Sequence, residues 1–560
     1  VRGVHSIDVA DVDGDGDLDF ACAGETGVVL FENKGGNSHH WLDVSLEAQQ
    51  IKGAEFSASG RVNAHGIGSL LELKTAMRYQ PRSVRRRTTH FGLGTQKAAD
   101  VVRVYWLNGV PQNIIEPAAD LFLCEQQILL GSCPYLYTWN GTEFVFATDL
   151  LWNAPLGLQR AQGDLMPSRE WEYLKLSGDS LVARDGQYVL QLTEELWEAA
   201  YFDQMQLLAV DHPADVEMYS NEKVGPPQIA QRKVHTVRTP RSPVSAHNHR
   251  GRDLLLELLT MDENYMKPFD IKLRQGLVEE YFIELDLGKL ENPGLVTLFL
   301  TGWTYPTTVN LNVALSQDLE LPLPVPPSLS VPDGSGGWKT VMPFMGFPGG
   351  KTKTIAVDLS GLLASEDSRI RIYSSMEMYW DSIFFTCGEE PAPMAIVNLE
   401  LVSANLHQRG YSRIEHMVGN GPEQFFYNAP LTATTWPPMQ GRFTRFGEVS
   451  ELLTEIDDRL LVLGAGDEVT LRFALPADPP HGWKRDFLLK SVGWDKDANL
   501  ATAAGQSVEP MPFVAMRSYP QSPDESLPDS EDYKAYLQEY QTRMQTEDFW
   551  QLIRRGPRAR

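Results

Sequence analysis

The chain has 560 residues, of which 42% are hydrophobic and 10% aromatic, a composition typical of a folded protein with several domains. Its formal net charge of −25 argues against sequence-independent binding of nucleic acid, because such binding needs Lys and Arg side chains that neutralise phosphates. The charge suits a calcium-rich environment outside the cytoplasm, and no stretch approaches the roughly 20 apolar residues of a membrane span.

The start of the chain, residues 1–38, predicts a strand, an acidic loop, a second strand, a turn and a third strand. This order fits one antiparallel blade of a β-propeller, and a single blade cannot bury its own faces. Because the aspartate motif does not recur, we expect the other blades to be removed or to lie outside this sequence. The first residues lack the basic start and apolar run of a signal peptide, so we expect a mature or truncated product.

The acidic loop, DVADVDGDGDLDF, carries an aspartate at every second position around Gly16. Ca²⁺ takes oxygen ligands with this spacing, and glycine permits the sharp bend. A solvated acidic turn is the alternative, but carboxylates this close repel one another unless a cation neutralises them. We expect carboxylate ligands from four residues and a backbone carbonyl from a fifth. They are Asp11, Asp13, Asp15 and Asp19, with Asp17 as the carbonyl donor.

The acidic loop followed by GVVLFENKGG resembles an FG-GAP (VCBS-type) repeat, the calcium-binding blade of integrin-like propellers. The segments WLDVSLEA, GIGSLLELK, HFGLG and VVRVYWLNGVPQNI, in this order, resemble the ASPIC/UnbV domain. That domain follows such propellers in the cartilage acidic protein family and its bacterial relatives. The resemblance covers about residues 1–130, and it departs from the family in having one repeat where several are normal. The positions that match the ASPIC/UnbV domain are Trp41, Leu42, Gly66, Ile67, Gly68, His90, Phe91, Gly92, Leu93, Gly94, Val104, Trp106, Gly109 and Asn113.

Residues 39–130 predict a small all-β domain, because LDVSL, SLLELK and VRVYWL are rich in Val, Leu and aromatic residues. We interpret HFGLG within this domain as a tight turn and not as a ligand loop. Cys124 and Cys133 flank a strand–turn stretch, and whether they pair in a disulfide stays open. No C-x-x-C motif supports a thiolate zinc site or covalent haem.

Residues 131–320 predict a β-rich domain of sandwich type. Its clearest element is the aromatic hairpin YLYTWNGTEFVFAT, which turns at Asn140-Gly141. The sequence Asn140-Gly141-Thr142 is formally a glycosylation acceptor, but a tight turn explains it better.

Residues 321–350 are rich in Pro and Gly and predict a linker or a long surface loop. Residues 351–527 then alternate like the strands of a β-sandwich. The pattern of six residues between 338 and 381 faintly resembles a galactose-binding-like jelly roll. Alternating aromatic residues are, however, more typical of a hydrophobic core than of a sugar-binding surface. They are Trp338, Lys351, Asp358, Leu359, Trp380 and Asp381.

Residues 528–560 predict a C-terminal amphipathic helix, over about 528–555, with a basic tail. Asp529 or Ser530 can cap the helix. Its apolar side chains are expected to pack on the β-domain, with docking on a partner as the alternative. The residues at helical spacing are Tyr533, Leu537, Tyr540 and Met544.

Two further motifs carry polar ligands without completing a known site. His247 and His249 are two apart, so both face one side of a strand, but a third metal ligand is not evident and a polar loop explains them better. Asp495, Asp497 and Asn499 form a D-x-D-x-N run without the central glycine, for which a turn with Asx hydrogen bonds is favoured over Ca²⁺ binding.

The sequence thus predicts an all-β protein: a partial propeller blade, a small β-domain, jelly-roll-like sandwich domains and a C-terminal helix. We expect a non-catalytic, calcium-binding, adhesion-like protein, secreted or attached to the cell surface, that binds protein or glycan partners or assembles with itself. We assign no catalytic residue, because no G-x-S-x-G, H-E-x-x-H or P-loop motif occurs. The alternative is a polysaccharide-acting hydrolase or its carbohydrate-binding subunit, which needs a cleft with a close carboxylate pair.

Overall fold

The computed structural model describes residues 2–48, 62–127, 134–318, 320, 322–415, 419–431, 436 and 439–545. These residues form many β-sheets and two α-helices, as expected for an all-β protein, and neither helix is long and apolar enough to cross a membrane. The helices are α1 (Val309–Gln317) and α2 (Glu531–Glu539), with short 3₁₀ turns at Gly36–Ser38, Leu255–Leu258 and Ser450–Leu453.

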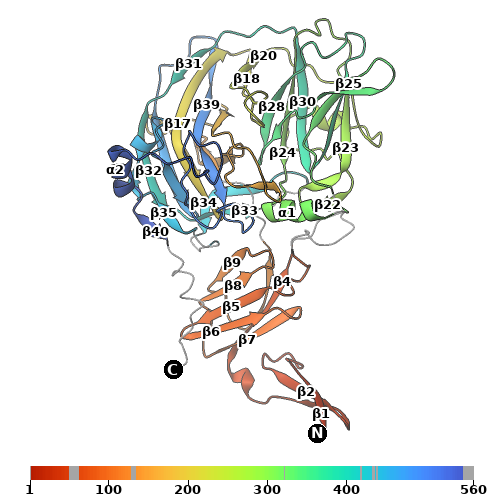
Figure 1. Ribbon diagram of the computed structural model, residues 1–560, viewed down its shortest axis with the longest axis vertical. Helices are drawn as coiled ribbons and strands as arrows, with labels where there is room; N and C mark the ends of the chain where they lie inside the picture. Colours follow the sequence, from red (N-terminus) through yellow and green to blue (C-terminus); the bar gives the residue numbers. More distant parts are fainter. Residues whose placement is uncertain are drawn as a thin grey trace.

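The N-terminal sheet lies at one end of the molecule, next to the small domain described below (Figure 1). Its antiparallel strands have the order β1-β2-β3, and the acidic loop connects β1 to β2. Both outer strands are solvent-exposed along their whole length. The strands are β1 (Val4–Ala10), β2 (Asp19–Gly24) and β3 (Gly27–Phe31).

Two sheets enclose a separate core between residues 40 and 126. One has the order β10-β4-β7, with β10 and β4 parallel, and the other has the order β6-β5-β8-β9. The core side chains come from both sheets and include Leu42, Leu71, Phe91 and Val104. The strands are β4 (His40–Glu47), β5 (Leu70–Thr75), β6 (Arg78–Ser83), β7 (Thr88–Gly94), β8 (Val101–Tyr105), β9 (Pro111–Ile115) and β10 (Leu121–Gln126).

The HFGLG segment was wrongly predicted to be a tight turn, because it lies inside strand β7. Phe91 and Leu93 point into the core at alternate positions, as the two-residue period of a strand requires. Gly92 and Gly94, which follow these two residues, weaken the apolar pattern of the sequence without interrupting the strand.

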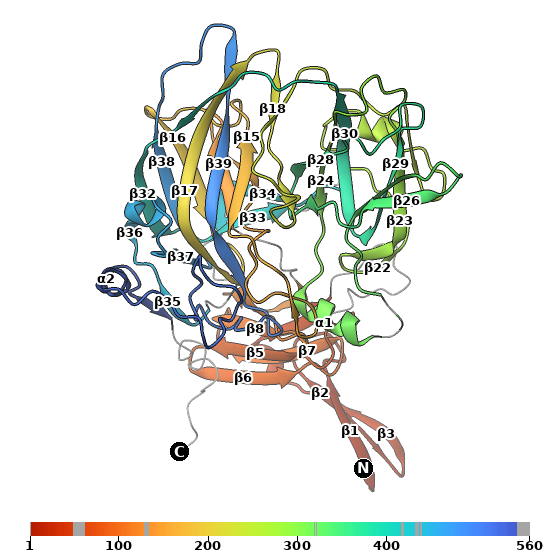
Figure 2. The same ribbon diagram turned by 45° about the horizontal axis from the view of Figure 1, so that its top comes forward.

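The rest of the described chain forms two larger units, and the first of them, here called the first unit, contains two sheets. One is six-stranded, with the order β12-β11-β16-β38-β32-β36. The other has the order β15-β39-β17-β31, with β37 beside β17. Strands β17 and β39 pair along almost their whole length and lie side by side in both views (Figures 1 and 2). The strands are β11 (Tyr135–Trp139), β12 (Phe144–Asp149), β15 (Trp171–Leu176), β16 (Gln187–Thr193), β17 (Glu198–Pro213), β31 (Ala395–Asn398), β32 (Leu401–Gln408), β36 (Gly447–Glu448), β37 (Leu461–Gly464), β38 (Asp467–Ala474) and β39 (Trp483–Asp497).

The second unit is inserted between strands of the first. It contains a sheet of order β21-β23-β29-β25-β26, with β22 beside β23, and a sheet of order β28-β24-β30. One hydrophobic core joins them, with Ile283, Leu298 and Trp380 among its buried side chains. The strands are β21 (Ser245–Asn248), β22 (Lys272–Arg274), β23 (Leu277–Asp286), β24 (Val296–Thr304), β25 (Ser328–Pro332), β26 (Trp338–Met342), β28 (Lys353–Asp358), β29 (Arg369–Met376) and β30 (Met378–Cys387).

The predicted division of the chain at 321–350 does not coincide with a boundary between sheets. Strands β25 and β26 fall in this segment and form a hairpin that extends the sheet through β29, so the segment is neither a linker nor a single long loop. Strand β16 pairs with β38, whose residues come almost three hundred positions later, so the chain leaves the first unit and returns to it. Pro and Gly content alone therefore misplaced the boundary.

Within the described residues, five small two-stranded sheets complete the fold: β13-β14, β18-β20, β19-β27, β33-β34 and β35-β40. The hairpin β33-β34 projects toward the second unit and is important for the site described below. The strands are β13 (Gln159–Ala161), β14 (Asp164–Leu165), β18 (Glu217–Tyr219), β19 (Lys223–Val224), β20 (His235–Val237), β27 (Phe347–Pro348), β33 (Tyr411–Glu415), β34 (Gln424–Leu431), β35 (Gly441–Phe443) and β40 (Arg543–Gln545).

The C-terminal helix is shorter than predicted. Ser530 caps α2 by accepting a hydrogen bond from Tyr533 N, and the helix ends at Glu539. Met544 is not on the helix, because it lies in β40, which pairs with β35. Tyr533 and Tyr540 are buried in the core of the first unit, so the helix packs on its own β-domain.

Cys124 is a free thiol on the surface, and Cys22 and Cys387 are free as well. Cys133 lies outside the described residues.

Candidate functional site: an acidic loop and a ligand cleft

The acidic loop, Asp11–Asp19, is shaped by two glycines and by a neighbouring tryptophan. Gly14 and Gly16 have φ angles of +79° and +91°, which other residues rarely adopt. A Cβ atom on Gly16 would lie 1.9 Å from Trp41 Nε1, so only glycine lets the loop pack against this indole. Because Trp41 belongs to β4, this contact also joins the N-terminal sheet to the small domain.

Three of the five predicted ligands are brought together. Carboxylate oxygens of Asp11, Asp13 and Asp15 all lie within 4.8 Å of one another. Partial desolvation, together with the negative charges of neighbouring aspartates, raises the pKa of Asp13 above its ordinary value. A cation between the three oxygens would remove this repulsion.

Backbone N–H groups hold these carboxylates in place. Asp11 Oδ1 accepts a hydrogen bond from Gly14 N at 2.7 Å, and Asp11 Oδ2 accepts one from Gly16 N at 3.0 Å. Asp15 Oδ1 accepts one from the N–H of Asp17 at 3.1 Å. Each carboxylate oxygen keeps a second lone pair for a cation, so these bonds fit a pre-arranged oxygen site.

The side chains of Asp17 and Asp19 anchor the loop. Asp19 Oδ1 accepts from Asn33 N at 2.8 Å, and Asp19 Oδ2 accepts from Val12 N at 3.0 Å. Asp17 is 5% exposed; its Oδ2 accepts from Asn37 N, and its Oδ1 is buried without a hydrogen-bond partner. This unsatisfied oxygen also fits a nearby cation.

Sequence reasoning missed the asparagines that follow β3. Asn37 Nδ2 donates to Asp15 Oδ2 at 2.7 Å, and Asn33 N donates to Asp19. The only sequence signal was the turn-forming composition ENKGGNS, which does not indicate that the turn folds back onto the acidic loop.

A cleft of about 810 Å³ lies between the first and second units. Strand β12 and the hairpin β33-β34 form the wall from the first unit, and the second unit contributes residues near 263, 351 and 381. Aromatic rings and polar groups alternate on these walls, a combination typical of sites for small ligands with both apolar faces and hydroxyl groups. The aromatic lining residues are Phe144, Phe146, Tyr265, Phe425, Phe426 and Tyr427.

The polar lining includes carboxylates with different partners. Lys351 forms an ion pair with Glu423, and Asn428 Nδ2 donates to Glu143 Oε2 at 2.8 Å. Asp381 Oδ1 accepts a hydrogen bond from Asp262 N at 3.1 Å. Burial, together with nearby carboxylates, raises the pKa of Asp381 above its ordinary value.

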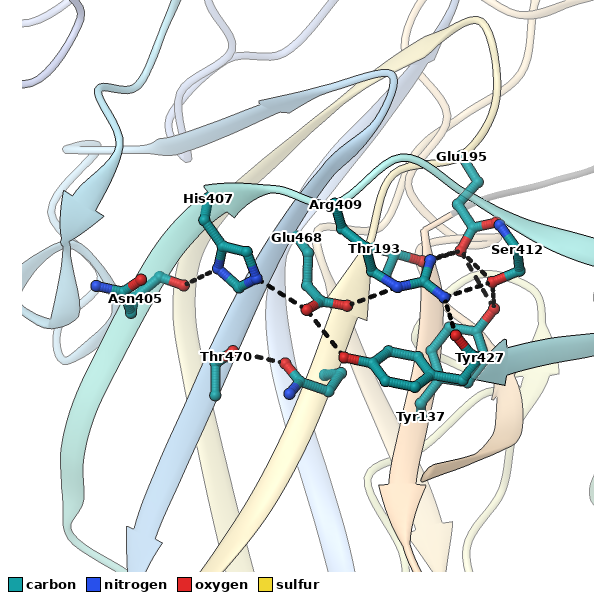
Figure 3. A network of polar contacts seen from close by, with 11 residues as sticks. Tyr137, Thr193, Glu195, Asn405, His407, Arg409, Ser412, Tyr427, Glu468 and Thr470 are labelled. Atoms are coloured by element: carbon teal, nitrogen blue, oxygen red, sulfur yellow. Dashed lines mark hydrogen bonds and ion pairs between the residues drawn. The ribbon is translucent and has the colours of Figure 1, made fainter. Parts of the chain in front are cut away.

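A buried network of polar contacts joins the hairpin β33-β34, which forms one wall of this cleft, to the sheets of the first unit (Figure 3). Arg409 lies between two carboxylates, with Nη1 3.1 Å from Glu195 Oε1 and Nε 3.3 Å from Glu468 Oε2. Its Nη2 donates to the carbonyl oxygen of Tyr427 at 2.7 Å, and the Tyr427 hydroxyl donates to Glu468 Oε1 at 3.0 Å. Ser412 N donates to Glu195 Oε2 at 2.6 Å, so both strands of the hairpin are held.

The tip of the same hairpin contacts the second unit. Asn420 Nδ2 donates to the carbonyl oxygen of Tyr265 at 3.0 Å, and Trp303 Nε1 donates to the carbonyl oxygen of Asn420 at 2.8 Å. The hairpin therefore connects the two units across one end of the cleft.

The two histidines singled out from the sequence, His247 and His249, do not line this cleft. His249 Nε2 is 3.8 Å from Glu279 Oε1, and the intervening Asn248 donates to the carbonyl oxygen of Pro268. Neither histidine belongs to a cluster of three metal-ligating side chains among the described residues. Of the jelly-roll-like positions, Trp380 is buried in the core, whereas Lys351 and Asp381 line the cleft.

No known family model matches the chain, and a search of curated proteins finds no match.

Proposed function

We propose that this protein is a non-catalytic, calcium-binding interaction protein, secreted or attached to the cell surface, whose cleft binds a glycan. The observation that carries the proposal is the cleft itself, which is lined by aromatic side chains, Phe426 and Tyr427 among them, together with carboxylates and amides. Sugars present apolar C–H faces and hydroxyl groups at once, so they need both kinds of contact. The acidic loop has a structural role here: Ca²⁺ bound by Asp11, Asp13 and Asp15 stabilises the N-terminal sheet.

The resemblance to FG-GAP and ASPIC/UnbV proteins remains part of this proposal. It is supported by the strand, acidic loop and strand order of β1 and β2, and by the close approach of carboxylates in the loop between them. The exposed outer strands of the N-terminal sheet are the surface through which further propeller blades or a protein partner would add.

A glycan array probed with the full chain tests the proposal. We expect binding to a defined set of glycans, and we expect Phe426→Ala to weaken that binding about tenfold because the ring lines the cleft. The matched control is Phe122→Ala, which removes a phenylalanine 58% exposed on the small domain and should leave binding unchanged. Equal loss in both variants, or no glycan bound by the wild-type protein, overturns the assignment.

A polysaccharide-acting hydrolase is the second candidate, and one observation favours it. Asp381 and Glu263 both line the cleft, so it offers two carboxylates to a bound ligand. Turnover of a polysaccharide panel, abolished by Asp381→Asn, would replace the binding proposal with this one.

A further inference from the structure

A second group of carboxylates lies inside the first unit, far along the chain from the acidic loop. Oxygens of Glu194, Glu198 and Asp495 all lie within 4.8 Å of one another. Glu194 follows strand β16, Glu198 begins β17, and Asp495 lies near the end of β39. The register places Asp495 opposite Ala200 and Asp497 opposite Glu198, which brings these acidic residues to one end of the β17-β39 pair.

Burial removes most of this cluster from water. Glu194 is fully buried and Glu198 is 4% exposed. Asp495 as a residue is half-buried, but its Oδ1 atom is buried and accepts no hydrogen bond. Among the described residues Asp495 also forms no ion pair with a Lys, Arg or His side chain. A buried carboxylate oxygen without a hydrogen bond lowers the stability of the fold unless a cation or a hydrogen-bond donor faces it.

The carboxyl groups of Glu198 and Asp495 lie at hydrogen-bonding distance from each other. Two ionised carboxylates cannot stay this close in a buried site, so the cluster must hold either a shared proton or a cation.

We propose that Glu194, Glu198 and Asp495 bind a divalent cation, Ca²⁺, between the end of strand β16 and the β17-β39 pair. All the side-chain ligands are carboxylate oxygens, which suit a hard cation and not Zn²⁺. Thr502 is 6% exposed in the loop that follows β39, and its Oγ1 is also buried without a hydrogen-bond partner.

Asp497 and Asn499, the other members of the D-x-D-x-N run, have a different role. Asp497 Oδ1 accepts a hydrogen bond from Asn499 N at 2.8 Å, and Asn499 Oδ1 accepts one from Ala501 N at 2.9 Å. These are the Asx turns that the sequence favoured. The cation site therefore contains only Asp495 from the D-x-D-x-N run. Its other two ligands are Glu194 and Glu198, which cannot be predicted from the spacing of that run.

The cation would join the two sheets of the first unit. Strand β16 belongs to the six-stranded sheet, whereas β17 and β39 belong to the sheet that faces it across a common core. A single ion held by Glu194 on one side and by Glu198 and Asp495 on the other thus links both layers. This role is independent of the acidic loop and of glycan binding.

The experiment uses the full chain with the acidic loop disabled by Asp11→Asn, Asp13→Asn and Asp15→Asn. Native mass spectrometry in Ca²⁺ should still find one calcium ion per chain. In thermal unfolding of the same protein, Ca²⁺ at about one hundred times its Kd should raise Tm by about 5 °C. If no calcium is retained and Tm does not respond to Ca²⁺, the cluster is a shared-proton pair and the proposal is wrong.

Asp495→Asn, added to this background, should abolish both the bound ion and the response of Tm to Ca²⁺. The matched control is Asp203→Asn, which changes a fully buried aspartate of strand β17 that lies outside the cluster, and it should retain both. Retention of the ion in the Asp495→Asn protein, or its loss in both variants alike, overturns the site. The ion count on the background protein decides the question even if Asp495→Asn fails to fold, because there the cluster is unchanged.

Discussion

The acidic loop and the buried carboxylate cluster differ in almost every respect except their ligand chemistry. Asp11, Asp13 and Asp15 come from one short loop, and backbone N–H groups of that loop orient them. Glu198 and Asp495 come from strands distant in sequence and become neighbours only because β17 pairs with β39. The first arrangement is local and largely solvated, whereas the second depends on the pairing of distant strands and is largely buried.

The difference shows how environment decides what a carboxylate cluster requires. Exposed carboxylates keep much of their hydration, so a cation bound there would order the loop without being required for folding. Buried carboxylates lose their hydration and must be neutralised. Elsewhere the chain supplies fixed cations for this purpose: Arg409 lies between Glu195 and Glu468, and Lys353 of the second unit pairs with Asp149 of the first.

The largest effect is expected when such a fixed cation is removed. Lys353 and Asp149 are both fully buried, and Lys353 also donates to the carbonyl oxygen of Gly349. Lys353→Ala leaves a buried carboxylate without its cation, and we expect a loss of about 3–5 kcal/mol of unfolding free energy in urea denaturation. The double variant Lys353→Met/Asp149→Asn should recover most of it. An unchanged unfolding free energy in Lys353→Ala would mean that burial does not impose neutralisation here.

A smaller, pH-dependent effect is expected at Asp203. Burial raises its pKa from 3.8 to about 7, although the N–H groups of Asp457 and Asp458 donate to its Oδ1. The folded state therefore holds a proton that the unfolded state has released, and stability falls as pH rises from about 4 to about 7.

Asp203→Asn should remove this slope, leave stability near pH 4 unchanged and add about 2–4 kcal/mol at pH 8. Urea denaturation across the pH range measures it. A slope identical to that of the wild-type protein would show that Asp203 is already ionised when folded.

The two acidic sites should also respond separately in hydrogen exchange. In Ca²⁺, Asp13→Ala should speed amide exchange in β1–β3 about tenfold and leave β17 and β39 unchanged, because the loop stabilises only the N-terminal sheet. Asp495→Asn should do the reverse. Glu32→Gln, at an exposed carboxylate just after β3, is the control and should alter neither region. Faster exchange throughout the chain in Asp13→Ala would show that the two sites are coupled.

The smallest effect is expected at the exposed link between the N-terminal sheet and the small domain. Arg86 donates to Asp8 Oδ1 at 2.9 Å and to the carbonyl oxygen of Val9 at 3.1 Å, and both side chains are solvent-exposed. Because water and salt screen such pairs, Arg86→Ala should shift Tm by less than about 1 °C. A larger shift in differential scanning calorimetry would mean that this ion pair, and not the packing of Trp41 on Gly16, holds the sheet in place.

The sequence by itself determined the features that depend on neighbouring residues. Alternating aromatics and the Asn140-Gly141 turn predicted the β11-β12 hairpin, which the structure confirms, and the candidate caps Asp529 and Ser530 predicted the start of α2, where Ser530 is the cap. The regular aspartate spacing predicted that Asp11, Asp13 and Asp15 approach one another, as their oxygens do. Each of these signals acts within a few residues, where backbone geometry alone sets the distances.

Only the tertiary structure decided which distant strands share a sheet. Three features depend on pairings between remote segments, which no local pattern specifies. They are the pairing of β38 with β16, the hairpin at 328–342 and the cleft between the two units. The same holds for the buried cluster, because an isolated Asp495 resembles any acidic turn residue. Its meaning comes from Glu194 and Glu198, two buried carboxylates that the packing of two sheets places beside it.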